Sequence, residues 1–217
     1  MKILILGATG RTGKHLVTSA LQKGYEVTCL VRSPEKVSRA KGLTILKGDP
    51  INIQDLELAM KDCDAVFSAL NISRTSDFPW AKLRTPKTYL SDVMANVITV
   101  AKKFSVNRVV ICSAWGVLET RKDIPFWFRW TIDFSNISVA YKDHERQEKL
   151  LETSNLNWTI VRPVGLINTQ HLQSVKETFQ NRPKPSLLIG RSSVANYMIE
   201  SIENEELFGQ KVVISKA

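Results

Sequence analysis

Short apolar runs alternate with longer amphipathic stretches along the whole chain. The first run covers residues 3–6 and is continuously apolar, which is typical of a strand buried on both faces of a sheet. Residues 12–23 then place apolar side chains at helical spacing, and Gly24 supplies the end of that helix. The chain therefore opens with a predicted strand and a predicted helix.

The same alternation continues to the C-terminus. Further strands are predicted at 25–31, 43–46, 65–67, 108–111, 158–161 and 211–215. Helices are predicted from Pro34, at 53–60, along 93–104, at 143–152 and from 194 past 202. Strands separated by helices imply right-handed crossovers. We therefore predict an α/β fold with a single doubly wound, mostly parallel sheet of Rossmann type and helices on both faces.

The pattern shows no linker and no repeat, so residues 1–217 are predicted to form a single domain. Ligands of such sheets bind beyond the carboxyl ends of the strands. We therefore expect the substrate-side elements to come from the irregular stretches 71–90, 114–142 and 164–190.

Composition narrows the class of protein. Hydrophobic residues make up 43% and charged residues 24% of the chain, as in globular proteins. No apolar run approaches the roughly 20 residues that span a bilayer, the N-terminus lacks a signal-peptide pattern, and Cys29, Cys63 and Cys112 lack metal-ligand spacing. We therefore expect a cytoplasmic protein without a metal and without a membrane partner.

The net charge of +9 attracts polyanions in general. Because the sequence has neither a stacked-aromatic nucleic-acid pattern nor a helix-turn-helix, we do not expect nucleic acid as a partner. The charge then has two explanations, which are a solvated basic surface and a pocket for nucleotide phosphates.

One glycine-rich loop lies directly between the first predicted strand and the first predicted helix. It reads Gly7-Ala8-Thr9-Gly10-Arg11-Thr12-Gly13. Here Gly7 permits a tight turn, Gly10 lets the backbone approach a pyrophosphate, and Gly13 lets helix and strand pack closely. The loop therefore predicts a dinucleotide site, with a purely structural turn as the alternative. No Gly-Lys-Ser/Thr follows, which excludes a nucleotide-hydrolysing P-loop.

The end of the second strand indicates which dinucleotide is bound. An NAD-binding protein carries an acidic residue there, whereas this chain has Arg32 and Ser33, which suit a 2′-phosphate. Arg11 is placed to reach the same phosphate from the loop. The prediction is NADP(H), and the alternative is that Arg32 lies unengaged in solvent. Asp49 either accepts a hydrogen bond from the adenine amine or caps a helix.

These segments resemble the atypical short-chain dehydrogenase/reductase family, specifically its NmrA-like NAD(P)-binding branch and the flavin reductase/biliverdin-IXβ reductase subgroup. The resemblance rests on the glycine loop, Leu30-Val31-Arg32-Ser33, Lys47-Gly48-Asp49, Ser113-Ala114 and Trp158-Thr159-Ile160-Val161-Arg162-Pro163. It implies that the loop holds the pyrophosphate and that the path toward the nicotinamide is lined by Ser68, Ala69 and Leu70. It also implies that Ser113 is the active-site serine, which polarises a carbonyl or orients the carboxamide. A strand-end cap is the alternative for Ser113.

The chain departs from the wider family at the catalytic acid. That family uses Tyr-x-x-x-Lys, in which the lysine lowers the pKa of the tyrosine, but Tyr141 is followed four positions later by Glu145. The pair Asp143-His144 resembles the acid-histidine pair of the subgroup, so His144 either lines the pocket and relays a proton or lies on the surface.

Four aromatic residues fall within 126–130. This stretch either stacks a planar acceptor with help from Arg129, forms a subunit interface, or packs as a helix on the core. With no catalytic acid, the expected function is NADPH-dependent hydride transfer to a planar conjugated small molecule such as a flavin or quinone. The alternative is a non-enzymatic NADP(H) sensor. In either case we expect a monomer or a small homo-oligomer.

Overall fold

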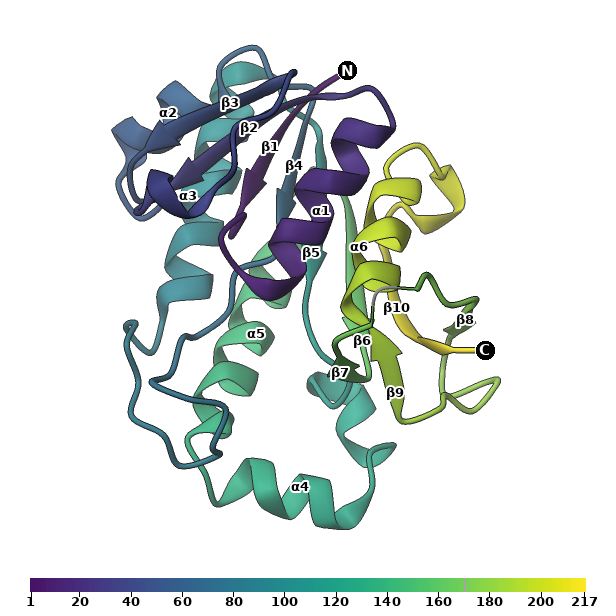
Figure 1. Cartoon of the computed structure of the whole chain (residues 1–217). Helices are drawn as coiled ribbons and strands as arrows, with labels where there is room; N and C mark the ends of the chain where they lie inside the picture. The colour runs from purple at the N-terminus through teal and green to yellow at the C-terminus, as the bar shows by residue number, and fades with distance from the viewer. Residues whose placement is uncertain (170) are drawn as a thin grey trace.

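The computed structural model describes residues 1–169 and 171–217. Its main sheet has eight strands in the order β3-β2-β1-β4-β5-β6-β10-β8 (Figure 1). Seven of these strands run parallel, and β8 pairs antiparallel with β10. The predicted doubly wound, mostly parallel sheet is therefore confirmed.

The strands agree closely with the apolar runs of the sequence. The parallel strands are β1 (Lys2–Leu6), β2 (Glu26–Val31), β3 (Leu43–Lys47), β4 (Ala65–Ser68), β5 (Arg108–Cys112), β6 (Asn157–Pro163) and β10 (Gln210–Lys216). The antiparallel edge strand is β8 (Val175–Thr178), and a separate pair is formed by β7 (Gly165–Ile167) and β9 (Leu188–Gly190). The sequence pattern gave no sign of β7, β8 and β9, because these short strands are only partly apolar.

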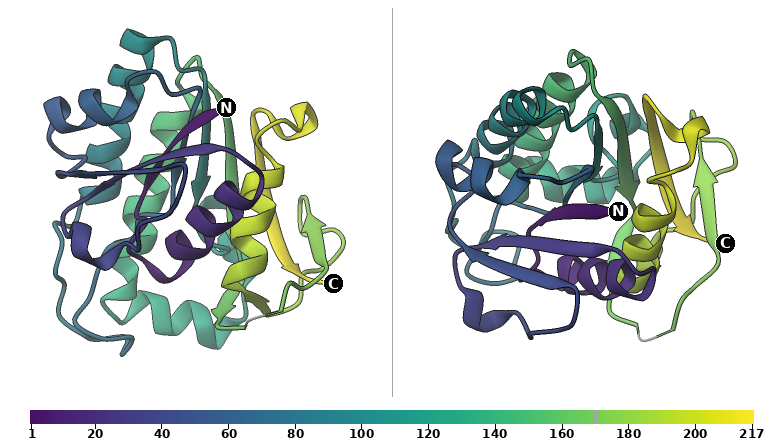
Figure 2. Two further views of the ribbon diagram at one scale, coloured as in Figure 1. Left: turned by 45° about the horizontal axis from the view of Figure 1, so that its top comes forward. Right: turned by 90° about the horizontal axis from the view of Figure 1, so that it is seen from above.

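Helices cover both faces of the sheet, as the right panel of Figure 2 shows. One face is covered by α1 (Arg11–Gln22) and α6 (Arg191–Glu200). The other is covered by α2 (Ile53–Met60), α3 (Tyr89–Phe104) and α5 (Ile137–Glu152). In β1, Ile3 and Ile5 face the first group while Leu4 and Leu6 face the second. This burial on both sides explains why the strand is apolar at every position.

The remaining helical elements lie outside these two layers. They are α4 (Phe126–Asp133) and the 3₁₀ turns η1 (Pro34–Lys36), η2 (Leu118–Lys122) and η3 (Glu205–Leu207). In Figure 1, α4 forms one end of the molecule, beyond the carboxyl ends of the parallel strands.

The bounds of two predicted helices are wrong. The helix expected to begin at Asp143 begins at Ile137, and the last helix covers 191–200 instead of running from 194 past 202. The polar pair Asp143-His144 suggested a helix start, but both side chains are buried in mid-helix. The other helix, α6, begins after its N-cap Gly190. Asp143 and His144 thus contact other parts of the folded chain, where a helix start would have faced solvent.

The strand order reverses between β1 and β4, which is the switch point where such sheets bind ligands. The chain leaves β1 at Gly7 and leaves β4 at Ala69, and the Ala69 N–H donates to the Leu6 carbonyl at 2.9 Å. The glycine loop and the segment 68–70 therefore lie side by side at the carboxyl edge of the sheet.

Candidate active site

The glycine loop has the geometry of an anion cradle. Gly7 has φ +85°, and a Cβ there would lie 2.8 Å from the Ala69 carbonyl. A Cβ on Gly13 would lie 2.0 Å from the Gly7 oxygen, so only glycine fits at either position. Gly10 is the N-cap of α1 and leaves the first-turn N–H groups without a side-chain cap. These residues fit a pyrophosphate, because the uncapped donors and the helix dipole attract it.

Arg32 lies at the end of β2 beside two other polar side chains. Its Nη1 is 4.0 Å from Asp49 Oδ2, and its guanidinium lies 5.7 Å from the ring centre of Tyr89. The Tyr89 hydroxyl donates to Asp49 Oδ1 at 2.8 Å. Arg32 is exposed, so its charge is free to meet a ligand phosphate. Ser33 follows it as the N-cap of η1 and makes no side-chain cap bond there.

The alternative prediction for Asp49 as a helix cap is wrong. The N-cap of α2 is Asn52, whose Oδ1 accepts from Gln54 N and Asp55 N. Asp49 instead connects Arg32 and Tyr89. Tyr89 was missed by the sequence analysis, since it comes 40 residues later and no local pattern relates it to Asp49.

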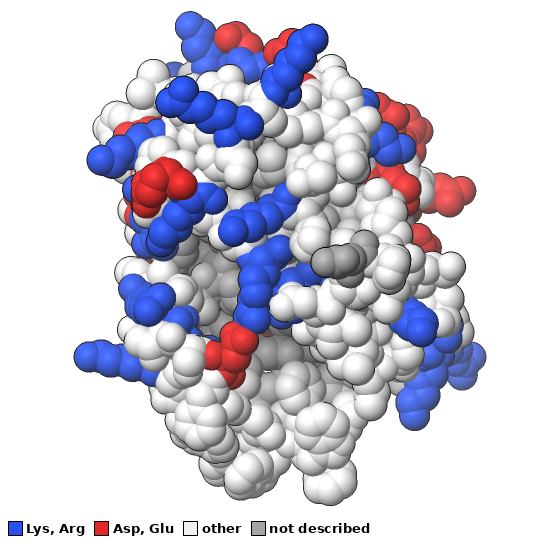
Figure 3. Space-filling model, in the orientation of Figure 1, with Lys and Arg blue, Asp and Glu red and all other residues white. Residues whose placement is uncertain are grey.

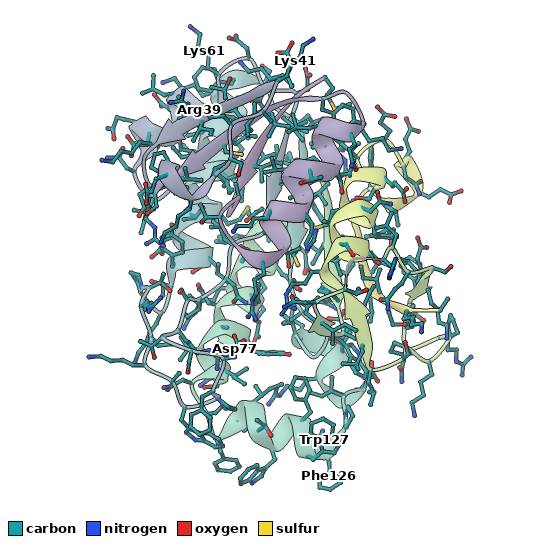
Figure 4. The ribbon with its side chains drawn as sticks, viewed as in Figure 1. Arg39, Lys41, Lys61, Asp77, Phe126 and Trp127 are labelled. Atoms are coloured by element: carbon teal, nitrogen blue, oxygen red, sulfur yellow. The ribbon has the colours of Figure 1, made fainter. Side chains whose placement is uncertain are left out.

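Arg11 is placed differently from its prediction. Its two Nη atoms donate to Asp77 at 2.8 and 2.7 Å, so the guanidinium is engaged by the 71–88 segment and not directed to the end of β2. Asp77 lies inward of α4 in Figure 4. Both side chains are exposed, so the pair contributes little stability and a ligand anion can replace the carboxylate.

A cavity of about 410 Å³ lies beyond the end of β5. Ser113, Tyr141 and His144 line it together with Phe128 of α4. Its lining also includes three arginines and one carboxylate, which are Arg11, Arg74, Arg191 and Asp77. Arg191 was missed by the sequence analysis. It is buried at the start of α6, and its Nη1 donates to Asn168 Oδ1 at 2.8 Å.

Ser113 is buried at the end of β5 and is bonded to a carboxylate. Its Oγ donates to Glu148 Oε1 at 2.5 Å, which is a bond to α5 and not a strand-end cap. Arg162 of β6 donates to the same carboxylate from Nε at 3.1 Å and from Nη2 at 2.5 Å. Burial raises the pKa of Glu148, while the bonds from Arg162 and Ser113 act against that rise. Glu148 and Arg162 therefore fix the Ser113 hydroxyl with its proton turned away from the cavity.

His144 is buried and not at the surface, so the surface alternative is wrong. Its Nδ1 has no hydrogen-bond partner among the described residues. Burial lowers the pKa of His144 to about 4, so the ring is neutral at physiological pH. An unpaired polar atom in a cavity wall is a natural partner for a ligand. The neighbouring Asp143 is structural, because it accepts from Leu90 N at 2.7 Å and Ser91 Oγ at 2.6 Å on α3.

Tyr141 lies in the cavity wall, where burial outweighs the charge of Arg121, which acts to lower its pKa. Its hydroxyl donates to the Trp115 carbonyl at 3.1 Å, and burial raises its pKa. Glu145, at the position where the wider family has lysine, pairs with Lys149 at 2.8 Å. Tyr141 is therefore a poor acid at neutral pH.

The other predicted residues lie near the cavity to different degrees. Ser68 is buried within β4, whereas Ala69 and Leu70 are partly exposed beside the glycine loop. In the aromatic stretch, Phe128 lines the cavity, but Phe126, Trp127 and Trp130 are exposed. The prediction that this stretch packs on the core is wrong for those three. Arg129 does not line the cavity, whose cations come from other elements of the described chain.

A family model described as NAD(P)H-binding matches residues 7–205. The chain belongs to the NAD(P)H-binding family. The match begins at the first residue of the glycine loop and ends beyond α6, so it includes both sides of the cavity. The predicted dinucleotide-binding Rossmann-type family is confirmed.

Curated relatives match most of this chain at low sequence identity. The photosystem II assembly factor Ycf39 of a Synechocystis strain is 27% identical over 214 residues, which cover 94% of this chain and 59% of that protein. This chain thus spans less than two thirds of the length of the Ycf39 relatives.

Two solved structures are similar to the whole chain. A short-chain dehydrogenase/reductase of Veillonella parvula in complex with NADP has a TM-score of 0.80 at 19% identity, with coverage of 99% of this chain and 94% of that one. ChuY, an anaerobillin reductase of Escherichia coli O157:H7, has a TM-score of 0.80 at 16% identity, with coverage of 100% and 97%. At these identities the likeness shows a shared fold.

Proposed function

We propose that this protein is an NADPH-dependent reductase that transfers hydride to a planar conjugated small molecule of the flavin or quinone class. The observation that carries the proposal is the cavity that begins where the glycine loop ends. Arg11 belongs to both, while Ser113 and His144 line the wall beyond it. A dinucleotide held by its phosphates at the loop would extend toward this cavity along 68–70.

The polar groups of the cavity suit an acceptor that needs hydride before it needs a proton. NADPH supplies the hydride when bound. The proton of Ser113 is held by Glu148, that of Tyr141 by a carbonyl, and His144 is neutral because its pKa is about 4. None of the three is a ready acid at neutral pH. Quinones and flavins fit, since solvent can protonate the product afterwards.

The charge of the cavity supports the same substrate class. Hydride addition to a quinone or flavin leaves a negative charge on the acceptor. Three arginines of the described chain line the cavity, and among the described residues one of them forms an ion pair, Arg11 with Asp77. Fixed cations in a partly buried site stabilise such a charge without reorganisation. Ser113 Oγ, whose proton points to Glu148, offers a lone pair to a donor such as the nicotinamide carboxamide.

The preference for NADPH rests on Arg32, which is exposed at the end of β2 where an NAD-binding protein carries an acid. The test measures melting temperatures with NADPH and with NADH. We expect a larger rise with NADPH for the native chain and the reverse for Arg32→Glu. The matched control is Lys61→Glu, which makes the same charge change on an exposed residue far from the site (Figure 4). Equal shifts with both cofactors for the native chain contradict the assignment.

The reductase activity is tested by following NADPH oxidation with flavins and with quinones of differing redox potential. Oxidation that depends on acceptor and on folded protein supports the proposal. If NADPH raises the melting temperature but no acceptor is reduced, the alternative of a non-enzymatic NADP(H) sensor replaces it. The absence of a ready acid in the cavity is the observation that keeps this alternative open.

A further inference from the structure

Helix α4 carries large apolar side chains on two opposite sides, yet only one of these sides is covered. Ile132 packs in the core and Phe128 lines the cavity. The opposite side carries Phe126 and Trp130, one turn apart, which are 76% and 57% exposed, and Trp127 beside them is 55% exposed. Large apolar residues exposed together on a surface mark a site of interaction. The outer side of α4 has this character.

A second segment extends this exposed surface. Phe78 and Trp80 are 62% and 47% exposed, and their ring centres are 5.3 Å apart. Trp80 Nε1 donates to the carbonyl of Phe134 at 2.7 Å, and Asn136 Nδ2 donates to the Trp80 carbonyl at 3.0 Å. The 71–88 segment is therefore fastened to the end of α4. Six exposed rings form what we call the aromatic cap: Phe78, Trp80, Phe126, Trp127, Trp130 and Phe134.

The aromatic cap contains most of the tryptophans of the chain. Three of the five tryptophans belong to it. Figure 4 shows Phe126 and Trp127 pointing away from the body of the protein. A continuous exposed apolar surface of this kind marks a site of interaction, whereas single exposed apolar residues do not.

The charges around the aromatic cap are mainly positive. The segments 71–88 and 126–136 contain five basic residues, which are Arg74, Lys82, Arg84, Lys87 and Arg129. Their two acids, Asp77 and Asp133, are each paired with an arginine. In Figure 3 the end formed by α4 shows no charged side chain on the visible face, and basic side chains lie above it together with an acidic side chain. The visible face of this end is therefore apolar, with a mainly basic surround.

We propose that the aromatic cap docks this protein on an anionic membrane surface. Tryptophan and phenylalanine enter the interface between headgroups and acyl chains, and basic residues around them are attracted to anionic lipids. A second copy on a two-fold axis would instead bring the same basic surround against itself. None of the helices in the described part of the chain has the length and hydropathy of a membrane span. The sequence analysis expected no membrane partner, and this proposal departs from that expectation because the exposed aromatic residues are brought together only in the folded protein.

Docking has a consequence for the substrate, and this part rests on the proposed function. The two segments that carry the aromatic cap also wall the cavity, through Phe128 of α4 and through Ile72, Arg74 and Asp77. The cavity of a docked molecule is therefore close to the bilayer. The acceptor class that fits is a quinone or related planar ring with a lipid tail, which is dissolved in the membrane.

The docking test is sedimentation of the full chain with vesicles. One set contains phosphatidylcholine alone and the other contains phosphatidylcholine with one third phosphatidylglycerol. We expect binding to the anionic vesicles, weakened by added salt. The variant Trp127→Ser/Trp130→Ser should bind about tenfold or more weakly, because two large apolar side chains no longer enter the interface. The control Leu58→Ser/Leu187→Ser removes two exposed apolar residues outside the aromatic cap and should bind as the native chain does.

Three results would overturn the docking proposal. These are no binding of the native chain at low salt, equal binding of the tryptophan variant, and a native dimer that the tryptophan variant dissociates, since a dimer assigns the surface to a second copy. Melting temperatures establish that the variants are folded. NADPH oxidation with a short-chain, water-dissolved quinone should be unchanged in the tryptophan variant, while oxidation with a long-chain quinone in anionic vesicles should fall. If vesicles bind but no acceptor is reduced, the proposed function fails and docking stands.

Discussion

Replacing Arg162 by Met removes the partner of a buried carboxylate. Arg162 is 1% exposed, and two of its nitrogens donate to Glu148, which is fully buried. Its other partner, Glu119, is half exposed and contributes little. Leaving a buried charge unpaired costs about 3–5 kcal/mol. At roughly 2–4 °C per kcal/mol for a chain of this length, the melting temperature should fall by about 10 °C.

The pH dependence of this loss has a definite sign. Without Arg162, only the Ser113 hydrogen bond opposes the effect of burial, and the pKa of Glu148 rises further above the unfolded value. The folded variant then holds a proton that the unfolded chain releases. Stability is therefore greatest below the unfolded pKa of about 4.3 and falls as pH rises toward neutrality. The deficit relative to the native protein should be smaller at pH 5 than at pH 7.5.

The assay is urea denaturation followed by tryptophan fluorescence and far-UV circular dichroism at both pH values. The control is the double variant Glu148→Met/Arg162→Met, which buries no charge and should recover most of the loss. The Ser113 hydroxyl loses its acceptor there, so a deficit of about 1–3 kcal/mol remains. If the single variant is as stable as the native protein, or if its deficit shrinks as pH rises, Arg162 does not neutralise Glu148 and the account of Ser113 orientation is wrong.

Three further substitutions address the site directly. Ser113→Ala should lower turnover about a hundredfold, because the nicotinamide carboxamide loses an orienting partner, while the NADPH-induced rise in melting temperature is kept; an unchanged rate would remove Ser113 from the mechanism. His144→Leu should remove the part of the acid destabilisation that falls between pH 6.5 and 4, about 3 kcal/mol. The reason is that the lowered pKa of about 4 makes the folded protein bind the proton less well than the unfolded chain does. An equal loss of unfolding free energy from pH 7.5 to pH 5 in the native protein and in the variant would contradict this. Gly13→Ala should disrupt the loop, since its Cβ would lie 2.0 Å from the Gly7 oxygen, and normal NADPH binding measured by calorimetry would refute the packing argument.

Most of the fold could be predicted from the periodicity of apolar residues, which depends on neighbours along the chain. The parallel strands are continuous apolar runs because both faces of the sheet are buried, and the glycine loop is recognisable because strand, turn and helix are adjacent in the chain. The end of β2 is equally local, so Arg32 and Ser33 could be named from the sequence. The short strands β7, β8 and β9 could not, since each is stabilised by pairing with a distant partner.

The sequence by itself predicted the seven parallel strands and the glycine loop, because each of these depends on neighbours along the chain. Ser113 was named through a family resemblance. Only the tertiary structure decided what surrounds them. Glu148 reaches Ser113 across 35 residues, Tyr89 reaches Asp49 across 40, and Asp77 reaches Arg11 across 66. It also decided that His144 is buried and that the aromatics of α4 are not. Burial, charge pairing and pKa values follow from distances in space, and a one-dimensional pattern contains no such distances.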